Sequence, residues 1–484
     1  MIEKESIPFA PHLIESMRSI GYSFETAIAD LIDNSISANA KRIDINLTPD
    51  VNPKLIIFDD GDGMDALKLE EALRYGSRSP LDERDETDLG RFGLGLKSAS
   101  LSQCRKLIVA SKKNGTINCF SWDLDTVIDK KGWIILQYDE DHIAELPMID
   151  LFDKIEHGTY VLLQNFDRIS SSTSDLSKTL NSNMNTMINH IALVFHRFLD
   201  CDVNIFVNNE KIEPLDPFLS YHKSTQILRE QYFEINNARI TVQPYILPII
   251  NKLSANDIQK VGGKQDLRTK QGFYIYRNKR LIIHGTWFAL ARKDELGKLA
   301  RVRVDIPNSL DYMWGIDVKK SAAFLPDLIK KNLFISVDES ILKSKIVHEY
   351  RGRKTNNADI NYIWERMELR DGCYEYKINR KLPQIEILRS NFSNEQVELF
   401  DVLIDSIESA FPTNSIYLDA SKGEIEDITD KDLEELYDDI KLQLNECEKN
   451  GLNSAIMLKI LLKTEPYCRY EKLKEKFAYE EVVL

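Results

Sequence analysis

The stretch "AIADLIDNSISA", residues 27–38, decides how the first part of this 484-residue chain folds. Wound as a helix, it places Asp30 and Asn34 one turn apart, on the same face as apolar positions 27 and 31. An ionisable acid beside apolar side chains is costly to bury for packing alone. Ser23 is the expected N-cap of this helix. The pattern therefore predicts a helix whose polar pair faces a functional site.

Length and composition limit the class of protein. The chain is longer than one ordinary core allows, and its 43% hydrophobic and 29% charged residues are typical of a soluble globular protein of two or three domains. No apolar run reaches the roughly 18 residues that span a bilayer. The start, "MIEKESIPFAPH", lacks the basic and apolar regions of a secretory signal. The six cysteines lie far apart without a C-x-x-C pair, which favours reduced thiols. We therefore expect a cytoplasmic protein without a membrane segment.

The charge is unevenly distributed. A net charge of −14 argues against a protein that coats nucleic acid over its whole surface. Lysine and arginine nevertheless outnumber acidic residues between positions 260 and 354, and acids predominate between 419 and 448. Two interpretations remain open: a nucleic-acid surface with an acidic arm nearby, or two solvated faces of opposite sign.

Helices and strands alternate over residues 1–172. Strands are expected at 41–48, 54–60 and 158–166, and helices at 66–76 and from Ser23 through Asp30 and Asn34. A hairpin is expected at 106–122, turning at Asn114-Gly115. The polar, proline-containing segment after residue 76 is expected to be a mobile loop. These patterns indicate an α/β domain.

Residues 173–382 are expected to form a mixed α+β domain, and residues 383–484 a helical region. The second domain would hold a helix over 185–199 and strands at 203–209, 239–247, 272–283 and 301–306. Aromatic and basic residues alternate within it, at Tyr274, Tyr276, Arg277, Lys279 and Arg280. This alternation fits either a nucleic-acid surface or a strand with one face in the core.

Three further stretches combine glycine with charged or hydroxyl side chains: "FDDGDGMD" (58–65), "GRFGLGLKSAS" (90–100) and "HGTYVLL" (157–163). Glycines let backbone N–H groups approach phosphate oxygens, and a following helix N-terminus adds a positive dipole end. Asp59, at a strand end, can accept the exocyclic amine of adenine, with the Thr159 hydroxyl in support. Asn34 suits Mg²⁺, and Asp30 can deprotonate a water. Together these stretches predict a nucleotide site.

The order of the motifs resembles the GHKL ATPases. Acid-x-x-x-Asn, D-x-G-x-G-M, G-x-x-G-x-G-L-K and G-T follow one another between residues 23 and 160. That superfamily includes gyrase B, the ninety-kilodalton chaperones, MutL, histidine kinases and MORC proteins, and "GYSFETAIADLIDNSISA" looks most like its bacterial MORC-like branch. The resemblance implies an α+β fold: a two-layer α/β-sandwich (Bergerat) ATP-binding domain at 1–172, an S5-like transducer domain at 173–382 and a helical C-terminal region at 383–484.

The resemblance also implies roles for single residues. Asp30 takes the place of the glutamate that activates water, Asn34 that of the Mg²⁺ ligand, and Asp59 that of the adenine-binding acid. Asp30 is one methylene shorter than the usual glutamate, a departure from the family pattern that bears on the rate of hydrolysis. Asp33 is expected to cap or solvate its helix. The other expected nucleotide contacts are Gly61, Gly63, Met64, Gly90, Phe92, Gly93, Leu94, Gly95, Leu96, Lys97 and Thr159, with residues 75–89 as the lid.

The segments "GFYIYRNKRLI" and "RVRVDIPNSLDYMWGIDVKKSAAFL" resemble the transducer domain of MutL, gyrase B and MORC proteins. In that domain a loop lysine reaches the γ-phosphate, which makes Lys319 and Lys320 the catalytic candidates, with Lys320 preferred. The alternative is a solvated pair of lysines beside a strand.

The function implied is a Mg²⁺-dependent ATPase in which ATP closes the lid and drives homodimerisation. By the same resemblance it acts on DNA, beside a nuclease or another phage-defence partner. Two alternatives stay open. One is a nucleotide-gated binding protein with negligible turnover, suggested by Asp30. The other is a histidine kinase, for which His12 is the one histidine before the Asp30 helix.

Overall fold

The computed structural model describes most of the chain, in two compact units at Met1–His348 and Glu349–Leu484. The described residues 360–368 and 374–382, which the sequence groups with the second domain, lie in the second unit. Most of the expected lid, and the candidates Gly90, Phe92, Gly93, Leu94, Lys319 and Lys320, lie outside the described residues. The described residues are 8–19, 21–50, 52–76, 89, 95–172, 175–294, 297–311, 313, 326–349, 360–368, 374–413, 415–416, 433–449 and 453–481.

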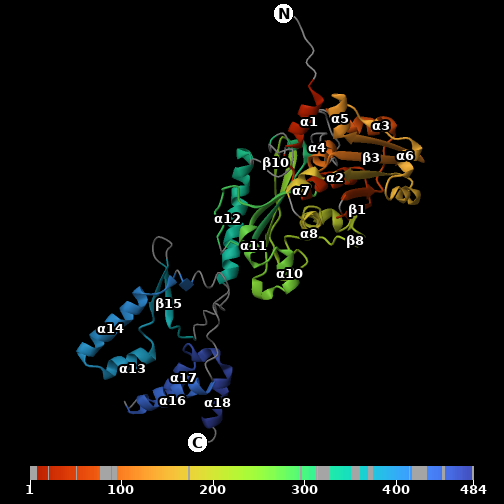
Figure 1. The fold of residues 1–484 in the computed structure, drawn as a ribbon. Helices are drawn as coiled ribbons and strands as arrows, with labels where there is room; N and C mark the ends of the chain where they lie inside the picture. Colours follow the sequence, from red (N-terminus) through yellow and green to blue (C-terminus); the bar gives the residue numbers. More distant parts are fainter. Residues whose placement is uncertain are drawn as a thin grey trace, which may run out of the picture. The chain divides into compact units, whose positions relative to one another are not determined.

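A mixed sheet lies among the helices of the first domain (Figure 1). It has eight strands, in the order β5-β4-β3-β6-β2-β1-β7-β8. Its strands are β1 (Arg42–Thr48), β2 (Lys54–Asp59), β3 (Lys106–Lys113), β4 (Thr116–Asp123), β5 (Leu136–Gln137), β6 (Gly158–Gln164), β7 (Asn204–Val207) and β8 (Glu210–Lys211). The β3–β4 hairpin turns at Asn114 and Gly115, whose φ angles are 52° and 80°. Two positive φ values are the signature of a type I′ turn, which confirms the predicted hairpin.

Both faces of this sheet are buried. Leu55 and Ile57 of β2 belong to a large core shared with the helices, whereas Ile56 and Phe58 face a smaller core. The large core draws on α1 (Ala10–Arg18), α2 (Phe24–Ser37), α3 (Ala66–Leu73), α4 (Gly95–Gln103), α5 (Leu124–Lys130), α7 (Asp167–Ser172), α8 (Leu176–Val194) and α9 (His196–Leu199). The smaller core is closed by α6 (Glu140–Ala144) and η1 (Ile149–Lys154). The domain is an α/β sandwich, as predicted, and α2 begins directly after Ser23.

The segment 203–209, expected in the second domain, belongs instead to the first sheet. There β7 runs parallel to β1, with Arg42 opposite Asn204, and Ile205 and Val207 enter the large core. A parallel partner needs a crossover connection, which α8 and α9 supply. The helix expected over 185–199 is divided between these two helices at Phe195.

A second, six-stranded sheet follows, in the order β10-β11-β14-β12-β13 with β9 on β11. Its strands are β9 (Gln226–Ile227), β10 (Gln231–Ile235), β11 (Ala238–Ile246), β12 (Gly272–Arg277), β13 (Arg280–Thr286) and β14 (Ala300–Ile306). One face packs against α11 (Lys264–Thr269) and α12 (Asp327–Glu349), while η2 (Ile250–Lys252), α10 (Ala255–Lys260) and η3 (Asn308–Leu310) lie in its connections. The other face is aromatic and meets α8 and α9, where His196 Nε2 lies 2.8 Å from Tyr276 Oη.

The aromatic-basic alternation lies mostly inside the protein. Tyr274, Tyr276, Arg277 and Arg280 are buried, while Lys279 is exposed. The interpretation of these residues as a nucleic-acid surface is therefore wrong, and the core interpretation is confirmed.

The second unit is largely helical, as predicted for residues 383–484. It contains β15 (Trp364–Glu368), β16 (Tyr374–Ile378), α13 (Pro383–Asn391), α14 (Asn394–Ser409), α16 (Leu433–Lys449), α17 (Ser454–Leu461), η4 (Tyr467–Arg469) and α18 (Glu471–Glu481). The small hairpin β15–β16 was not predicted. Leu436, Ile440, Leu461 and Leu473 lie in the core of the last helices.

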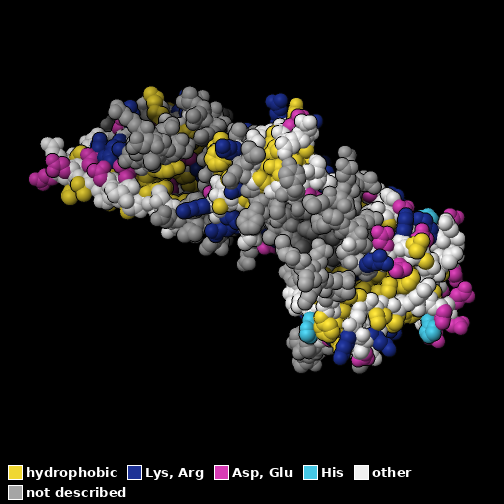
Figure 2. Space-filling model, turned by 90° about the horizontal axis from the view of Figure 1, so that it is seen from above, with side chains coloured by type: hydrophobic (Ala, Val, Ile, Leu, Met, Phe, Trp, Pro, Cys, Tyr) yellow, Lys and Arg dark blue, Asp and Glu magenta, His cyan; other side chains and the backbone are white. Residues whose placement is uncertain are grey.

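Two general expectations can be checked on the described residues. Their cysteines, Cys104, Cys119, Cys201, Cys447 and Cys468, are free thiols, as the spacing predicted. None of their helices is both long and apolar enough for a bilayer crossing. Figure 2 shows basic side chains interspersed with acidic and hydrophobic ones on the visible face, so its described part carries charge of both signs.

Candidate nucleotide-binding site

Asp59, the last residue of β2, has a buried carboxylate with three donors. Its Oδ2 accepts from Ser35 Oγ at 2.6 Å, and its Oδ1 accepts from the backbone N–H groups of Gly61 at 3.0 Å and Thr159 at 3.2 Å. Burial raises the pKa of Asp59 to about 6, against the opposing effect of these hydrogen bonds. At neutral pH the group is therefore a mostly ionised acceptor with a fixed direction.

Glycine is required at two places beside this carboxylate. Gly63 has φ +62°, and a Cβ there would lie 2.0 Å from the carbonyl oxygen of Lys112. A Cβ on Gly158 would lie 2.2 Å from the carbonyl oxygen of Asp59. The loop after β2 can approach β3, and the start of β6 can approach the end of β2, only because these two positions have no side chain.

Hydroxyl groups line the same strand ends. Thr159 is the register partner of both Asp59 and Ser111. Ser111 Oγ donates to the carbonyl of Gly158 at 2.9 Å, accepts from the N–H of Met64 at 2.8 Å, and lies 3.2 Å from Thr159 Oγ1. Ser111 thus fixes the backbone of Met64, while the Thr159 N–H donates to Asp59.

Asp30 lies on α2, about 7.5 Å along the helix axis from Ser35. Its side chain is only 4% exposed, and its Oδ2 accepts from Tyr22 Oη at 2.9 Å. A Cβ built on Gly95, the first residue of α4, would lie 3.7 Å from the same oxygen. The acid therefore adjoins the positive end of the α4 dipole, where a developing negative charge is stabilised.

Asn34 is exposed on α2, one turn beyond Asp30. Among the described residues, no group of three or more His, Cys, Asp or Glu side chains could hold a metal. Mg²⁺ commonly takes one or two protein oxygens and completes its shell with water and phosphate oxygens. The accessible amide of Asn34 therefore fits a Mg²⁺ ion that arrives with a nucleotide.

Lys97 is held away from solvent by α3. Its Nζ donates to the carbonyl oxygens of Ala72 and Arg74, both at 2.9 Å, and burial lowers its pKa to about 8. These carbonyls lie directly before the expected lid. The predicted phosphate contact of Lys97 therefore requires that its ammonium leave the carbonyls of Ala72 and Arg74. Leu96, the preceding residue, is half-buried.

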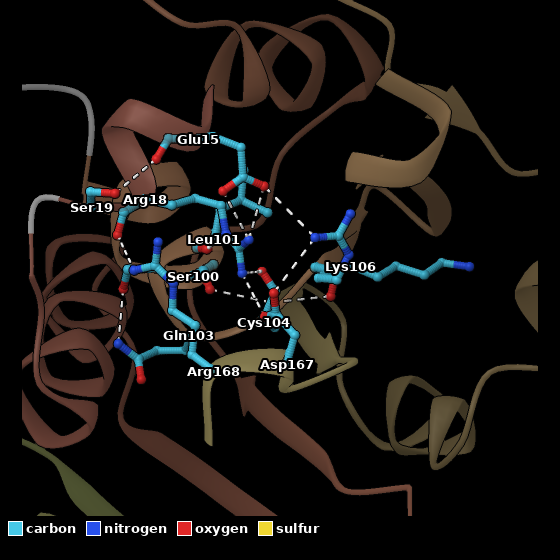
Figure 3. Close-up of polar contacts among 12 residues, drawn as sticks. Glu15, Arg18, Ser19, Ser100, Leu101, Gln103, Cys104, Lys106, Asp167 and Arg168 are labelled. Atoms are coloured by element: carbon cyan, nitrogen blue, oxygen red, sulfur yellow. Dashed lines mark hydrogen bonds and ion pairs between the residues drawn. The ribbon is translucent and has the colours of Figure 1, made fainter. Parts of the chain in front are cut away.

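A polar cluster fixes the opposite end of α4 (Figure 3). Arg18 of α1 donates from Nε to the carbonyl of Leu101 and from Nη2 to Asp167, both at 2.6 Å. Gln103 Nε2 donates to the carbonyl of Tyr22 at 3.1 Å. The contacts that hold α4 therefore also fix Tyr22, whose hydroxyl reaches the acid on α2.

The expectation that Asp33 caps or solvates its helix is wrong. It is 1% exposed, and both of its oxygens lie 3.0 Å from Nε of Arg280 in β13. A buried carboxylate needs a charged or hydrogen-bonding partner, and here the second domain supplies it.

The structure thus brings Asp59, the glycines after it and Thr159 together at the strand ends. Asp30 and Asn34 lie on α2, which is joined to Asp59 by the hydrogen bond from Ser35. Sequence reasoning missed Tyr22, Ser35, Ser111 and Arg280. Ser111 had a signal, a small polar residue within the buried apolar run of β3. Arg280 had none, because its partner lies in another domain.

Comparisons with known proteins identify sequence relatives of the segment that carries this site. Residues 22–159 match the family described as "Histidine kinase-, DNA gyrase B-, and HSP90-like ATPase". The chain is 34% identical over 97 residues to human "ATPase MORC2", which is 19% of this chain and 9% of that protein. It is 33% identical over 96 residues to "DNA mismatch repair protein MutL" of Rickettsia felis, which is 20% of this chain and 16% of that protein.

The match therefore spans a small part of the length of these relatives. A solved structure described as the N-terminal domain of a DNA repair protein aligns with a TM-score of 0.44 and 15% identity, over 70% of this chain and 98% of the other. The matched segment contains the buried acid, the glycine turns and the helix of Asp30 described above. Residues 22–159 are thus a domain of the GHKL superfamily of ATPases, in the group that includes MORC2 and MutL.

Proposed function

We propose that this chain binds ATP with Mg²⁺ and hydrolyses it. The observation that carries the proposal is the Asp59 carboxylate, buried at the end of β2 and held by three donors. A fixed, ionised acceptor between glycine turns suits the exocyclic amine of adenine. Its pKa of about 6 leaves it ionised at neutral pH.

The remaining roles follow from the helix α2. Asn34 holds the metal ion, which offsets phosphate charge when bound. Asp30 accepts a proton from the attacking water, and the N-terminal end of α4 adjoins it. Lys97 leaves the carbonyls of α3 and engages the phosphates.

The wider cycle follows from the family resemblance. ATP closes the lid at 75–89, brings Lys319 or Lys320 of the transducer-like second domain to the γ-phosphate, and joins two protomers. We further propose a cytoplasmic, DNA-associated clamp, because the matched relatives include a protein named for DNA mismatch repair. A role beside a nuclease or another phage-defence partner rests on resemblance alone, and plaque counts with and without the gene test it.

One observation favours a second candidate, a nucleotide-gated binding protein with negligible turnover. Asp30 is shorter than glutamate, and Tyr22 Oη already occupies one of its oxygens. A carboxylate held this way can orient water without removing its proton at a useful rate.

Separate measurements of binding and turnover test the proposal. ATP affinity is measured with and without Mg²⁺ by calorimetry, phosphate release at steady state, and protomer mass with a non-hydrolysable ATP analogue. The proposal expects Mg²⁺-dependent binding, phosphate release and analogue-dependent dimers. Tight binding without phosphate release would favour the second candidate, and an acid-labile phosphohistidine would indicate a histidine kinase.

A further inference from the structure

The β12–β13 hairpin ends in the sequence RNKR (277–280), with a buried arginine on each side of the turn. Arg277 and Arg280 are register partners, 4% and 5% exposed. Asn278 and Lys279 between them have φ angles of 47° and 67°, as a tight type I′ turn requires. Two buried guanidinium groups at a hairpin tip are costly unless each has partners.

Arg277 fixes the position of the tip. Its Nε donates to both oxygens of Asp311 at 2.8 and 2.9 Å, and its Nη1 donates to the carbonyl of Leu89 at 3.0 Å. In the turn itself, Lys279 Nζ pairs with Asp202 at 2.7 Å. The tip is therefore attached to the first domain at two points besides Arg280.

Arg280 contacts the helix of the proposed catalytic acid. Its Nε lies 3.0 Å from each oxygen of Asp33, and its Nη2 lies 3.9 Å from Oδ1 of Asp30. The two acids share one face of α2, because they are three residues apart. All three side chains are buried, so the guanidinium offsets the repulsion between two carboxylates in a medium of low dielectric constant.

Asp30 is thereby held from two sides. Its Oδ2 accepts from Tyr22 Oη at 2.9 Å, and its Oδ1 faces Arg280. A general base must be directed at the attacking water, and a small displacement of such a group lowers the rate of the reaction strongly. Tyr22 comes from the first domain, and Arg280 from the second.

We propose that Arg280 is a positioning residue for Asp30, so that the second domain completes the hydrolytic site of the first. The proposal rests on the ATP hydrolysis proposed above. Arg280 acts through Asp30 and Asp33, and its removal alters the direction of the acid while the adenine site at the end of β2 stays intact.

The test uses full-length Arg280→Gln, Arg280→Lys and Asp33→Asn, with Lys279→Gln as a matched control from the same turn. Arg280→Gln is expected to lower kcat roughly 10- to 100-fold. Its Kd for a non-hydrolysable ATP analogue is expected to stay within about threefold of wild type, because the adenine contacts remain. Arg280→Lys recovers part of the loss, because it keeps the charge without the planar fork. Lys279→Gln leaves kcat unchanged, because its exposed ion pair with Asp202 contributes little to the position of the tip.

An Arg280→Gln protein that binds the analogue, stays folded at the assay temperature and turns over at the wild-type rate overturns the proposal. Parallel loss of binding and turnover also overturns it, because that result indicates general loss of structure.

If Arg280→Gln does not fold, Asp33→Asn decides. There Arg280 loses the carboxylate that holds its guanidinium in place, so Asp30 is no longer held in the same direction. The same fall in kcat with retained binding is expected, and a wild-type rate overturns the proposal. A wild-type protein that binds ATP without releasing phosphate refutes the proposed hydrolysis, and the positioning role with it. That outcome is distinguishable because it appears before any variant is made.

Discussion

The hydroxyl of Ser35 donates to the carboxylate of Asp59 across 2.6 Å and so joins α2 to the end of β2. The helix that carries Asp30 and Asn34 is thereby tied to the acid proposed to bind adenine. A nucleotide that engages Asp59 would therefore meet the proposed metal ligand Asn34 and the proposed general base Asp30 on one helix, because that helix is joined to the end of β2 by one short hydrogen bond.

Replacement of Asp59 by asparagine separates binding from stability. Asp59→Asn is expected to weaken ATP binding roughly 10- to 100-fold, since a charge-assisted hydrogen bond to the adenine amine is lost. At pH 7.5 the variant is expected to melt no lower than wild type, because it no longer buries a charge. Calorimetric titration with ATP and a thermal melt measure the two effects. Unchanged ATP affinity in the folded variant would contradict the adenine role.

The raised pKa of Asp59 predicts opposite pH effects on binding and stability. Below pH 6 the carboxyl is protonated and no longer accepts the amine, so ATP affinity is expected to fall by up to about tenfold per pH unit. The folded-state pKa lies above the ordinary value of 3.8, so the folded state binds the extra proton between pH 4 and 6. The contribution of Asp59 to the free energy of unfolding is therefore fully present below pH 4. It is lost as pH rises through 6, and the loss is on the order of 3 kcal/mol.

Denaturant unfolding of wild type and Asp59→Asn across pH 4–8 checks the stability effect. The difference between the two proteins in free energy of unfolding is expected to grow in favour of the variant between pH 4 and 6 and to level off above pH 6. Parallel curves would show that Asp59 does not titrate in this range.

Asn34 and Asp30 are expected to separate metal-dependent binding from hydrolysis. Asn34→Ala removes Mg²⁺-dependent ATP binding, because the exposed amide oxygen is lost. Asp30→Ala spares binding and lowers turnover by roughly 10²–10⁴, the effect of removing a general base. Affinity with and without Mg²⁺ and steady-state phosphate release are measured for both. Equal loss of both properties in the two variants would contradict these roles.

Replacement of Lys97 is expected to weaken the binding of ATP but not that of adenosine, which has no phosphate. Lys97→Met should weaken ATP binding roughly 10- to 100-fold, as one charged phosphate contact is lost, and leave adenosine binding unchanged. Lys68→Met, from the exposed side of α3, is the control and should change neither affinity. If Lys97→Met lowers the affinities for ATP and for adenosine together with the melting temperature, Lys97 stabilises the fold through the carbonyls of Ala72 and Arg74 and does not bind phosphate.

Local features of the fold and site could be predicted from the sequence. The helix of Asp30 follows from its periodicity, the β3–β4 turn from Asn114-Gly115, and the acid at the end of β2 from an apolar run before glycine. Asp33 could not be assigned, because its partner Arg280 lies 247 residues along the chain. The place of β7 was missed for the same reason: its alternating pattern suits either sheet, and only long-range pairing with β1 decides between them.

The position of β7 and β8 has a practical consequence for anyone who wants the ATP-binding domain as a fragment. A cut after residue 172 follows the boundary that the motifs suggest, yet it removes the parallel neighbour of β1 and the helix that covers it. The truncated piece would expose unpaired backbone groups along β1, the kind of open border through which sheets of separate molecules join. An expression fragment should therefore continue through residue 212, whose isoleucine closes that side of the hydrophobic interior.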